Sequence, residues 1–162
     1  MPKRRGWRYD GPNSRLDVDV DGTTVARFDD STGVDVRTGD LTVQSGNLDM
    51  VAGTLDIQDG GAVTQATNRT TGVTLSNYSG KVTGDDASLA AVTIATHTVT
   101  NTLVAATDNV IITKVSGDAD TSAFVSAVAS GSFNVSVRNN HASGADTTAF
   151  VYNFALIKSA IA

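Results

Sequence analysis

The sequence offers few side chains for acid–base, nucleophilic or metal chemistry. It contains no Cys and no Glu, which excludes thiolate nucleophiles, thiolate metal sites and pairs of catalytic Glu residues. Its two histidines are His97, in a stretch that alternates apolar and polar residues, and His141, in a polar turn. Neither has a second His or an acid at the spacing typical of metal ligands. A Gly-x-Ser-x-Gly nucleophile elbow and a Gly-rich phosphate loop are also missing. We therefore expect no catalytic site, no cofactor and no bound metal.

An acidic motif at residues 17–22 matches the first half of a calcium loop. Its Asp-x-Asp-x-Asp-Gly spacing is that of the EF-hand positions that hold Ca²⁺. The twelfth position of such a loop would be Phe28 instead of a bidentate Glu, and no helical pattern flanks the motif. Residues 16–29 instead alternate apolar and polar side chains around Asp21-Gly22, a hairpin-turn dipeptide. We expect a β-hairpin whose Asp side chains face water.

The elements that position these side chains are expected to be strands. All 17 acidic residues are Asp, Thr is the most frequent residue type (22), Val is close behind (20), and there are only 8 Leu. β-Branched residues favour strands, whereas the helix formers Glu and Leu are absent or scarce. Since 40% of the 162 residues are apolar, an ordinary core can form. The composition excludes a helical bundle, a coiled coil and a helix-rich α/β enzyme, and it predicts an all-β fold.

Charge and hydropathy exclude two further classes of protein. No run approaches the ~20 apolar residues that a membrane-spanning helix needs. The basic N-terminus lacks the apolar stretch of a secretory signal. The net charge of −5 argues against binding nucleic acid over a broad surface. We expect no membrane insertion and no nucleic-acid partner.

The uneven distribution of charge indicates three regions, residues 1–33, 34–61 and 62–162. Residues 1–60 carry 11 of the 17 Asp. The first 15 residues are predicted to be an arm with a basic and aromatic cluster: Arg4, Arg5, Trp7, Arg8 and Tyr9. The arm is either a solvated, disordered terminus or an anchor, because Trp and Arg often carry interface energy. Contact with nucleic acid is a third reading, but so few cations give only weak, salt-sensitive affinity.

Residues 34–61 contain four consecutive seven-residue repeats. Each repeat has apolar residues at its first and third positions and Gly at its sixth. That Gly would weaken a helix by about 1 kcal/mol per repeat, and a spacing of two is the period of a strand. Each repeat is therefore expected to be a very short strand and a turn, which needs stacked neighbours for stability. The apolar positions are Val34, Val36, Leu41, Val43, Leu48, Met50, Leu55 and Ile57.

We interpret these repeats as a fibrous β stem in which three chains wind together around the apolar positions. A two-chain or a single-chain β-solenoid is the alternative. Both arrangements satisfy the requirement that a repeat with one small apolar face must stack on others.

Residues 62–162 are predicted to form a compact β domain. Eight short strands separated by turns that contain Gly, Asn or Asp indicate a two-sheet sandwich or jelly roll. The last strand is apolar on both faces, so its outer face, with Val151, Ala155 and Ile157, would need a partner such as a neighbouring subunit. The expected strands are residues 62–67, 72–75, 80–83, 92–101, 109–115, 123–129, 132–138 and 148–158.

A diffuse pattern of short motifs runs through this C-terminal region. It includes Gly60-Gly-Ala-Val-Thr-Gln-Ala-Thr67, Thr98-Val-Thr-Asn101 and Asn153-Phe-Ala-Leu-Ile-Lys158. The pattern covers about 60% of the chain and resembles the C-terminal β-sandwich knobs of tailed-bacteriophage virion proteins. Short Gly-punctuated repeats before a knob are similar to the stems of phage fibres and capsid decoration proteins. The resemblance implies a homotrimeric virion surface protein without enzymatic activity.

Two virion roles follow from this resemblance. A capsid decoration or cement protein would bind the major capsid protein on the capsid exterior and stabilise the lattice. A tail-fibre or tail-needle knob would join tail proteins and bind a host receptor. Four repeats make only a short spacer, which favours decoration. In either role the protein would be made in the host cytoplasm and end on the virion surface. A carbohydrate-binding module is a third hypothesis, for which Tyr78 is the best stacking residue.

Overall fold

The computed structural model describes residues 5–10, 15–20, 23–29, 33–36 and 60–159. The chain divides into two compact units, residues 1–54 and 55–162, which are taken separately below. The described residues form strands, turns and irregular segments without a helix, which confirms the predicted all-β fold.

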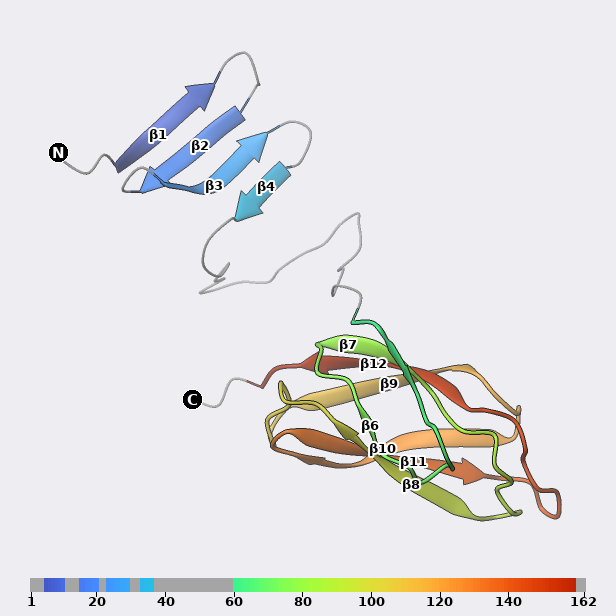
Figure 1. Ribbon diagram of the computed structural model, residues 1–162. Coiled ribbons are helices and arrows are strands. Elements are labelled where there is room, and N and C mark those ends of the chain that lie inside the picture. The colour runs from blue at the N-terminus through green and yellow to red at the C-terminus, as the bar shows by residue number, and fades with distance from the viewer. Residues whose placement is uncertain (1–4, 11–14, 21–22, 30–32, 37–59, 160–162) are drawn as a thin grey trace. The chain divides into compact units, whose positions relative to one another are not determined.

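The N-terminal unit contains a four-stranded antiparallel sheet in the order β1-β2-β3-β4 (Figure 1). Strands β2 and β3 form the hairpin predicted for residues 16–29, with Leu16 opposite Phe28. Residues 17–20 of the acidic motif therefore lie in a strand and not beside a helix. The strands are β1 (Arg5–Asp10), β2 (Arg15–Val20), β3 (Thr23–Asp29) and β4 (Gly33–Val36).

The structure corrects the prediction of a disordered or extended arm. Residues 5–10 form β1, an edge strand in which Trp7 lies opposite Val18 of β2. The edge of a hairpin presents unpaired N–H and C=O groups that can pair with a further strand. Aromatic residues such as those in this segment favour strands. At the other edge, β4 adds the start of the first repeat to the same sheet.

The C-terminal unit contains two four-stranded sheets that pack face to face (Figure 1). One has the order β5-β7-β12-β9 and the other the order β10-β11-β8-β6. All eight predicted strands are present. The strands of the first sheet are β5 (Ala62–Thr64), β7 (Ser79–Thr83), β12 (Val151–Ile157) and β9 (Asn109–Ser116). Those of the second are β10 (Thr121–Ala129), β11 (Ser132–Asn139), β8 (Ile94–Thr100) and β6 (Val73–Thr74).

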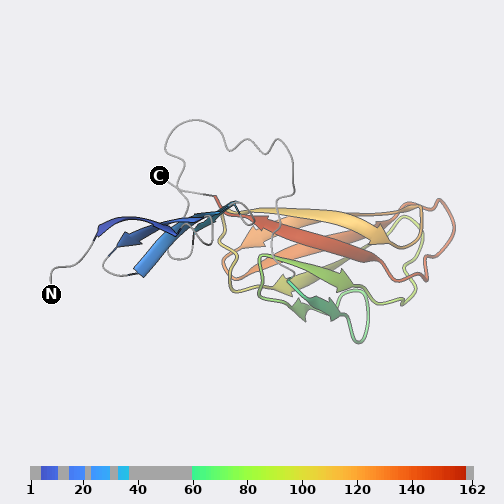
Figure 2. The ribbon, with the colours of Figure 1, turned by 90° about the horizontal axis from the view of Figure 1, so that it is seen from above.

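The chain alternates between the two sheets from β5 to β10, and only β10 and β11 are consecutive neighbours. Strand β12 then returns between β7 and β9, as the view of Figure 2 shows. The turn between β10 and β11 contains Gly131 with φ of 82°, a conformation that a side chain would strain. The pairs β5–β7 and β6–β8 are parallel, so the edges of this sandwich depart from a purely antiparallel jelly roll.

The core lies between the two sheets and follows from the period of two in the strands. In β8 and β12 every second residue is buried. Phe133 of β11 and Phe154 of β12 meet edge to face across the core, with ring centroids 5.3 Å apart. The fully buried apolar residues include Val82, Val99, Phe133, Val135 and Tyr152.

The strand register gathers four connecting segments at one end of the sandwich. Thr83 and Ser116, at the ends of β7 and β9, both lie opposite Val151 at the start of β12. At the same end, Asn139 closes β11 opposite Thr121 of β10. We call this the loop end; it comprises residues 65–71, 84–93, 117–120 and 140–150.

Candidate functional site

His97 lies inside the sandwich, where it joins the two sheets. The alternation of β8 turns its ring toward the core, and its Nε2 lies 2.7 Å from the Tyr152 hydroxyl of β12. Its Nδ1 is buried and has no hydrogen-bond partner among the described residues. Burial lowers the pKa of His97 to about 4 and raises the pKa of Tyr152 above its usual range, because the interior disfavours both charged forms. His97 is thus a neutral side chain at pH 7.

The cavity beside His97 is too small for a substrate. Its volume is about 10 Å³, which is close to the space of a single water. The lining includes Gln65, Arg69 and Phe150, which belong to the loop end or border it. The His97–Tyr152 pair can therefore bridge the sheets and accommodate a small polar molecule, but it cannot reach a larger ligand from this cavity.

Arg69 and Asp146 form a buried ion pair at the loop end. The Arg69 Nη2 and Asp146 Oδ2 atoms are 3.2 Å apart, and the side chains are 7% and 0% exposed. Arg69 also donates to the carbonyls of Ala87, Asp146 and Thr148. Asp146 accepts from the Thr121 hydroxyl at 3.1 Å and from the Thr148 amide at 2.7 Å. Because these bonds join residues from four segments of the chain, the pair holds the segments together.

A second polar cluster at the loop end is half exposed. The His141 ring places Nε2 3.0 Å from Asp118 Oδ1 and Nδ1 3.3 Å from Asp120 Oδ2. The Asp120 amide also donates to Asp118 Oδ1, and this bond, followed by that from His141, holds the pKa of Asp118 below its usual value. The ligand atoms of the three side chains lie within 4.8 Å of one another. The sequence places no acid at ligand spacing from His141, and the fold brings Asp118 to it from 23 positions away.

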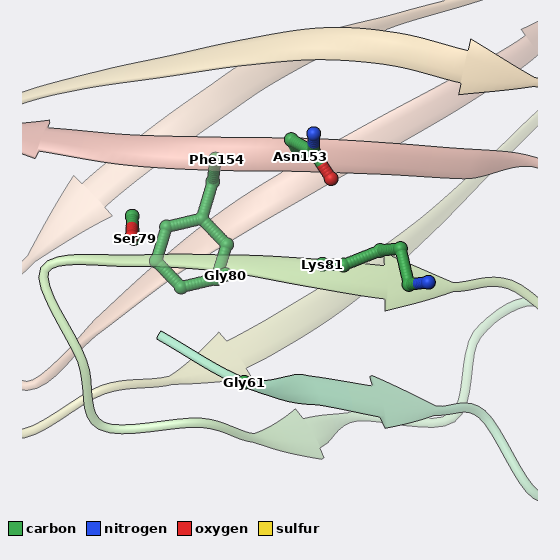
Figure 3. Close-up of a pocket in the computed structure, with 6 residues that line it drawn as sticks. All are labelled: Gly61, Ser79, Gly80, Lys81, Asn153 and Phe154. Atoms are coloured by element: carbon green, nitrogen blue, oxygen red, sulfur yellow. The ribbon is translucent and has the colours of Figure 1, made fainter. Parts of the chain in front are cut away.

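A shallow recess of about 160 Å³ lies over β7, β12 and the start of β5 (Figure 3). Lys81 and Asn153 lie opposite each other on adjacent strands, and the Phe154 ring extends toward Gly80. A Cβ on Gly80 would be 2.5 Å from Leu75 Cδ2, so a larger residue at this position would force the Leu75 side chain to move. The recess offers an amine and an amide to a polar ligand.

Both outer faces carry exposed apolar side chains. On the β5-β7-β12-β9 sheet, Ile111, Val115 and Ile157 are 50%, 53% and 49% exposed. On the other sheet, Ile94 and Phe124 are 51% and 47% exposed. Hydroxyl and amide groups also bond to one another on that sheet: Thr96 to Ser136 at 2.8 Å, Ser136 to Ser126 at 2.9 Å, and Thr98 to Asn134 at 2.9 Å. The apolar outer face expected of the last strand is therefore present at Ile157 and extends onto β9.

The residues predicted to anchor the chain lie along the edge strand of the N-terminal unit. Arg5, Trp7, Arg8 and Tyr9 belong to β1, and Arg4 lies outside the described residues.

The residues predicted to form the stem core are divided between the N-terminal sheet and the part of the chain that is not described. Val34 and Val36 pair with Phe28 and Ala26 in the sheet. Leu41, Val43, Leu48, Met50, Leu55 and Ile57 lie outside the described residues, so the stem stays a prediction.

Sequence reasoning missed both ion-pair clusters of the loop end. The turns that contain Asp118 and His141 were both predicted, but the two residues are 23 positions apart in the sequence. Arg69 and Asp146 are 77 positions apart. The sequence gives no signal for either cluster, because residues 62–162 contain two Arg and six Asp and their spacing does not indicate which of them pair.

Comparison with known proteins does not add to these observations. No protein-family model, characterised protein or solved structure matches the chain. No helix in the described part of the chain is long and apolar enough to cross a membrane. The function therefore has to be argued from the residues themselves.

Proposed function

We propose that the protein is a structural virion component, a homotrimeric decoration protein of a tailed-phage capsid. It would bind the major capsid protein on the outside of the lattice and stabilise the shell. The observation that carries the proposal is the division of the chain into two units with different surfaces. One is a sheet with a basic and aromatic edge strand, and the other is a sandwich with a closed interior.

The edge strand β1 supports a role in anchoring. It pairs only with β2 in the described structure, so its second edge can add to a strand of a partner. Arg5, Trp7, Arg8 and Tyr9 lie on this strand, and Arg, Trp and Tyr are the residue types that most often carry interface energy. Three such strands in a trimer would bind together, and their combined affinity would exceed that of one strand.

The outer face of the β5-β7-β12-β9 sheet supports self-association. Ile111, Val115 and Ile157 are branched or apolar side chains at about half exposure, next to the half-buried Ala155 opposite Ile111. Exposed apolar groups that lie together favour burial against another surface. Copies of the same chain are the occupants that the predicted trimeric stem would bring close.

The proposed mechanism is mechanical. A trimer that spans the contacts between capsid subunits adds interactions that must break before the shell opens. Because the three anchors act together, the loss of one contact does not release the protein.

The first test is the number of copies per particle. Particles labelled at the C-terminus of this chain should carry hundreds of labels distributed over the capsid. A few trimers at the tail would refute decoration and support the alternative, a tail-fibre or tail-needle knob that binds a host receptor. Binding of a saccharide to the isolated protein, lost in Tyr78→Ala, would support the third hypothesis of a carbohydrate-binding module.

The second test separates the anchor and the self-association. A trimer of 16.7 kDa chains has a native mass of about 50 kDa, three times 16.7. Ile111→Lys should lower this mass toward that of one chain, whereas Thr98→Lys on the other sheet should not. Trp7→Ala should abolish particle binding and leave the mass unchanged. A native mass near 17 kDa for the wild type, or particle binding by Trp7→Ala, would contradict the corresponding part of the proposal.

A further inference from the structure

One ring nitrogen of His97 is buried without a hydrogen-bond partner. Among the described residues, His97 Nδ1 is the single buried side-chain nitrogen or oxygen that no donor or acceptor reaches. The residue is 3% exposed, so bulk water does not solvate this atom. Buried polar atoms in folded proteins almost always have a partner, and each exception calls for a physical explanation.

The contact on the other side of the ring decides which nitrogen carries the proton. The Tyr152 hydroxyl lies 2.7 Å from His97 Nε2, and this is its one hydrogen bond in the described part of the chain. Burial keeps the hydroxyl protonated at pH 7, because it raises the pKa of Tyr152 above its usual range. The hydroxyl therefore donates to Nε2, and the neutral ring carries its own proton on Nδ1. The unpartnered group is thus an N–H donor.

A cavity of about 10 Å³ beside His97 has the size of one water and further polar groups in its lining. Gln65 and Arg69 are among the lining residues. Gln65 Oε1 accepts one hydrogen bond, from the Asp85 amide at 3.0 Å, and an amide oxygen can accept two. Arg69 uses Nε and Nη2 in its described hydrogen bonds, which leaves the N–H groups of Nη1.

These groups require a ligand that both accepts and donates hydrogen bonds. The N–H of His97 needs an acceptor, and the free lone pair of Gln65 Oε1 can take a donor. A metal cation cannot accept from an N–H group, and a halide cannot donate to the amide oxygen. A water does both through one oxygen atom, and the volume of the cavity excludes a larger molecule.

We propose that His97, Gln65 and Arg69 form a binding site for one internal water. The water accepts from His97 Nδ1 and donates to Gln65 Oε1, and Arg69 supplies a further donor. Gln65 also bonds to two carbonyls of the loop-end segment at residues 65–71, so the water joins this segment to β8. The inference is independent of the proposed virion role, since it rests on groups inside the sandwich alone.

The direct test is a high-resolution crystal structure of the full chain at neutral pH. One ordered water is expected in the cavity, about 2.7–3.2 Å from both His97 Nδ1 and Gln65 Oε1. A cavity that contains no ordered water would overturn the proposal. A protein oxygen that accepts from Nδ1 would overturn it as well, because the ring would then need no ligand.

A second measurement reads the proton and the water in solution. The ¹⁵N chemical shifts of the His97 ring at pH 7 should be those of the tautomer protonated at Nδ1. The Nδ1 proton should also show a cross peak to a long-lived water in water-selective NMR spectra. A ring protonated at Nε2 would contradict the proposal, since Nδ1 would then have no proton to donate.

Three variants separate this site from the rest of the fold. Tyr152→Phe removes the donor to Nε2, so the ¹⁵N shifts of His97 should move toward the other tautomer and the water cross peak should weaken. Tyr78→Phe, at a tyrosine that is 50% exposed, is the matched control and should change neither signal. Gln65→Leu removes the acceptor and should abolish the cross peak while His97 keeps its tautomer. A cross peak of full intensity in Gln65→Leu would overturn the assignment of the site.

Discussion

The interior of the sandwich and its loop end each hold one histidine. His97 faces Tyr152 between the sheets, is 3% exposed, and is kept neutral by burial. The His141 side chain is 32% exposed and lies beside two carboxylates that also reach water. Protonation therefore destabilises the structure around the enclosed His97. The two histidines differ in their access to solvent and in the chemistry of their partners.

The two ion-pair clusters of the loop end differ in the same way. Arg69 and Asp146 are enclosed, so removal of either partner leaves a buried charge. Asp118 and Asp120 retain access to water, which can solvate them when their contacts with His141 are lost. Loss of the buried Arg69–Asp146 pair should therefore be costly, whereas loss of the contacts in the exposed cluster should cost little stability. The predictions below test this contrast.

The largest effect is expected from breaking the buried pair. Asp146→Asn removes the negative charge and leaves the Arg69 guanidinium buried without a counter-ion, which should lower the free energy of unfolding by about 3–5 kcal/mol. Denaturant unfolding at pH 7 measures this loss, and Asp120→Asn is the matched control in the exposed cluster. Equal, small losses for both variants would show that burial does not separate the two clusters.

Acid should destabilise the interior through His97. Its pKa is about 4 in the folded protein, against a reference value of 6.5 in an unfolded chain. Between these values the unfolded chain binds a proton that the folded chain does not, so the contribution is complete above pH 6.5 and is lost as the pH falls toward 4. The difference corresponds to about 3 kcal/mol at pH 4.

This second prediction is checked by the free energy of unfolding at pH 7 and pH 4 in the wild type and in His97→Gln. Glutamine can still bond to the Tyr152 hydroxyl but does not titrate, so the variant should lose less stability on acidification than the wild type. If both proteins lose the same free energy between these pH values, His97 is not the group that senses acid in the interior.

A smaller effect is expected from a buried hydroxyl group of the β10-β11-β8-β6 sheet. Ser136 is only 4% exposed, and its hydroxyl bonds to Thr96 and Ser126. Ser136→Ala should cost about 1 kcal/mol, the usual net contribution of a neutral hydrogen bond, and the cost should not depend on pH. Thermal unfolding at pH 5 and pH 7 measures both properties. If Ser136→Ala lowered the free energy of unfolding as much as Asp146→Asn does, a buried neutral group would matter as much as a buried charged one.

The smallest effect is expected at the exposed cluster itself. At pH 7, His141→Gln should change the thermal midpoint by no more than about 2 °C, because exposed charged contacts contribute little to stability. High salt screens such contacts and should reduce the difference from the wild type further. A large drop of the midpoint would mean that His141 is a structural residue, as His97 is.

Much of the sandwich could be predicted from local sequence. The alternation in residues 94–100 and 151–157 has the period of a strand, and turn dipeptides mark where strands end, so all eight strands were found. The errors lie at the boundaries. The strand expected at 62–67 ends at Thr64, because the Gln65 side chain bonds to the carbonyls of Arg69 and Thr71 and holds a turn.

The N-terminal unit shows how context overrides a local interpretation. The segment at residues 1–15 is short and charged, which is typical of a free arm, yet residues 5–10 pair with β2. The hairpin at 16–29 was predictable from its turn. Its two open edges can each accept a further strand, and the prediction did not include those strands. The same omission applies to β4, which was assigned to the repeats.

The sequence by itself determined the β class, the strands and the absence of thiol and Glu chemistry, since each depends on residue types or on neighbours a few positions apart. Only the tertiary structure decided that His97 would be neutral and that His141 would meet two carboxylates. Both outcomes depend on contacts between residues 23 or 55 positions apart. The charge of a histidine is set by its solvent access and its partners, and strand packing supplies both.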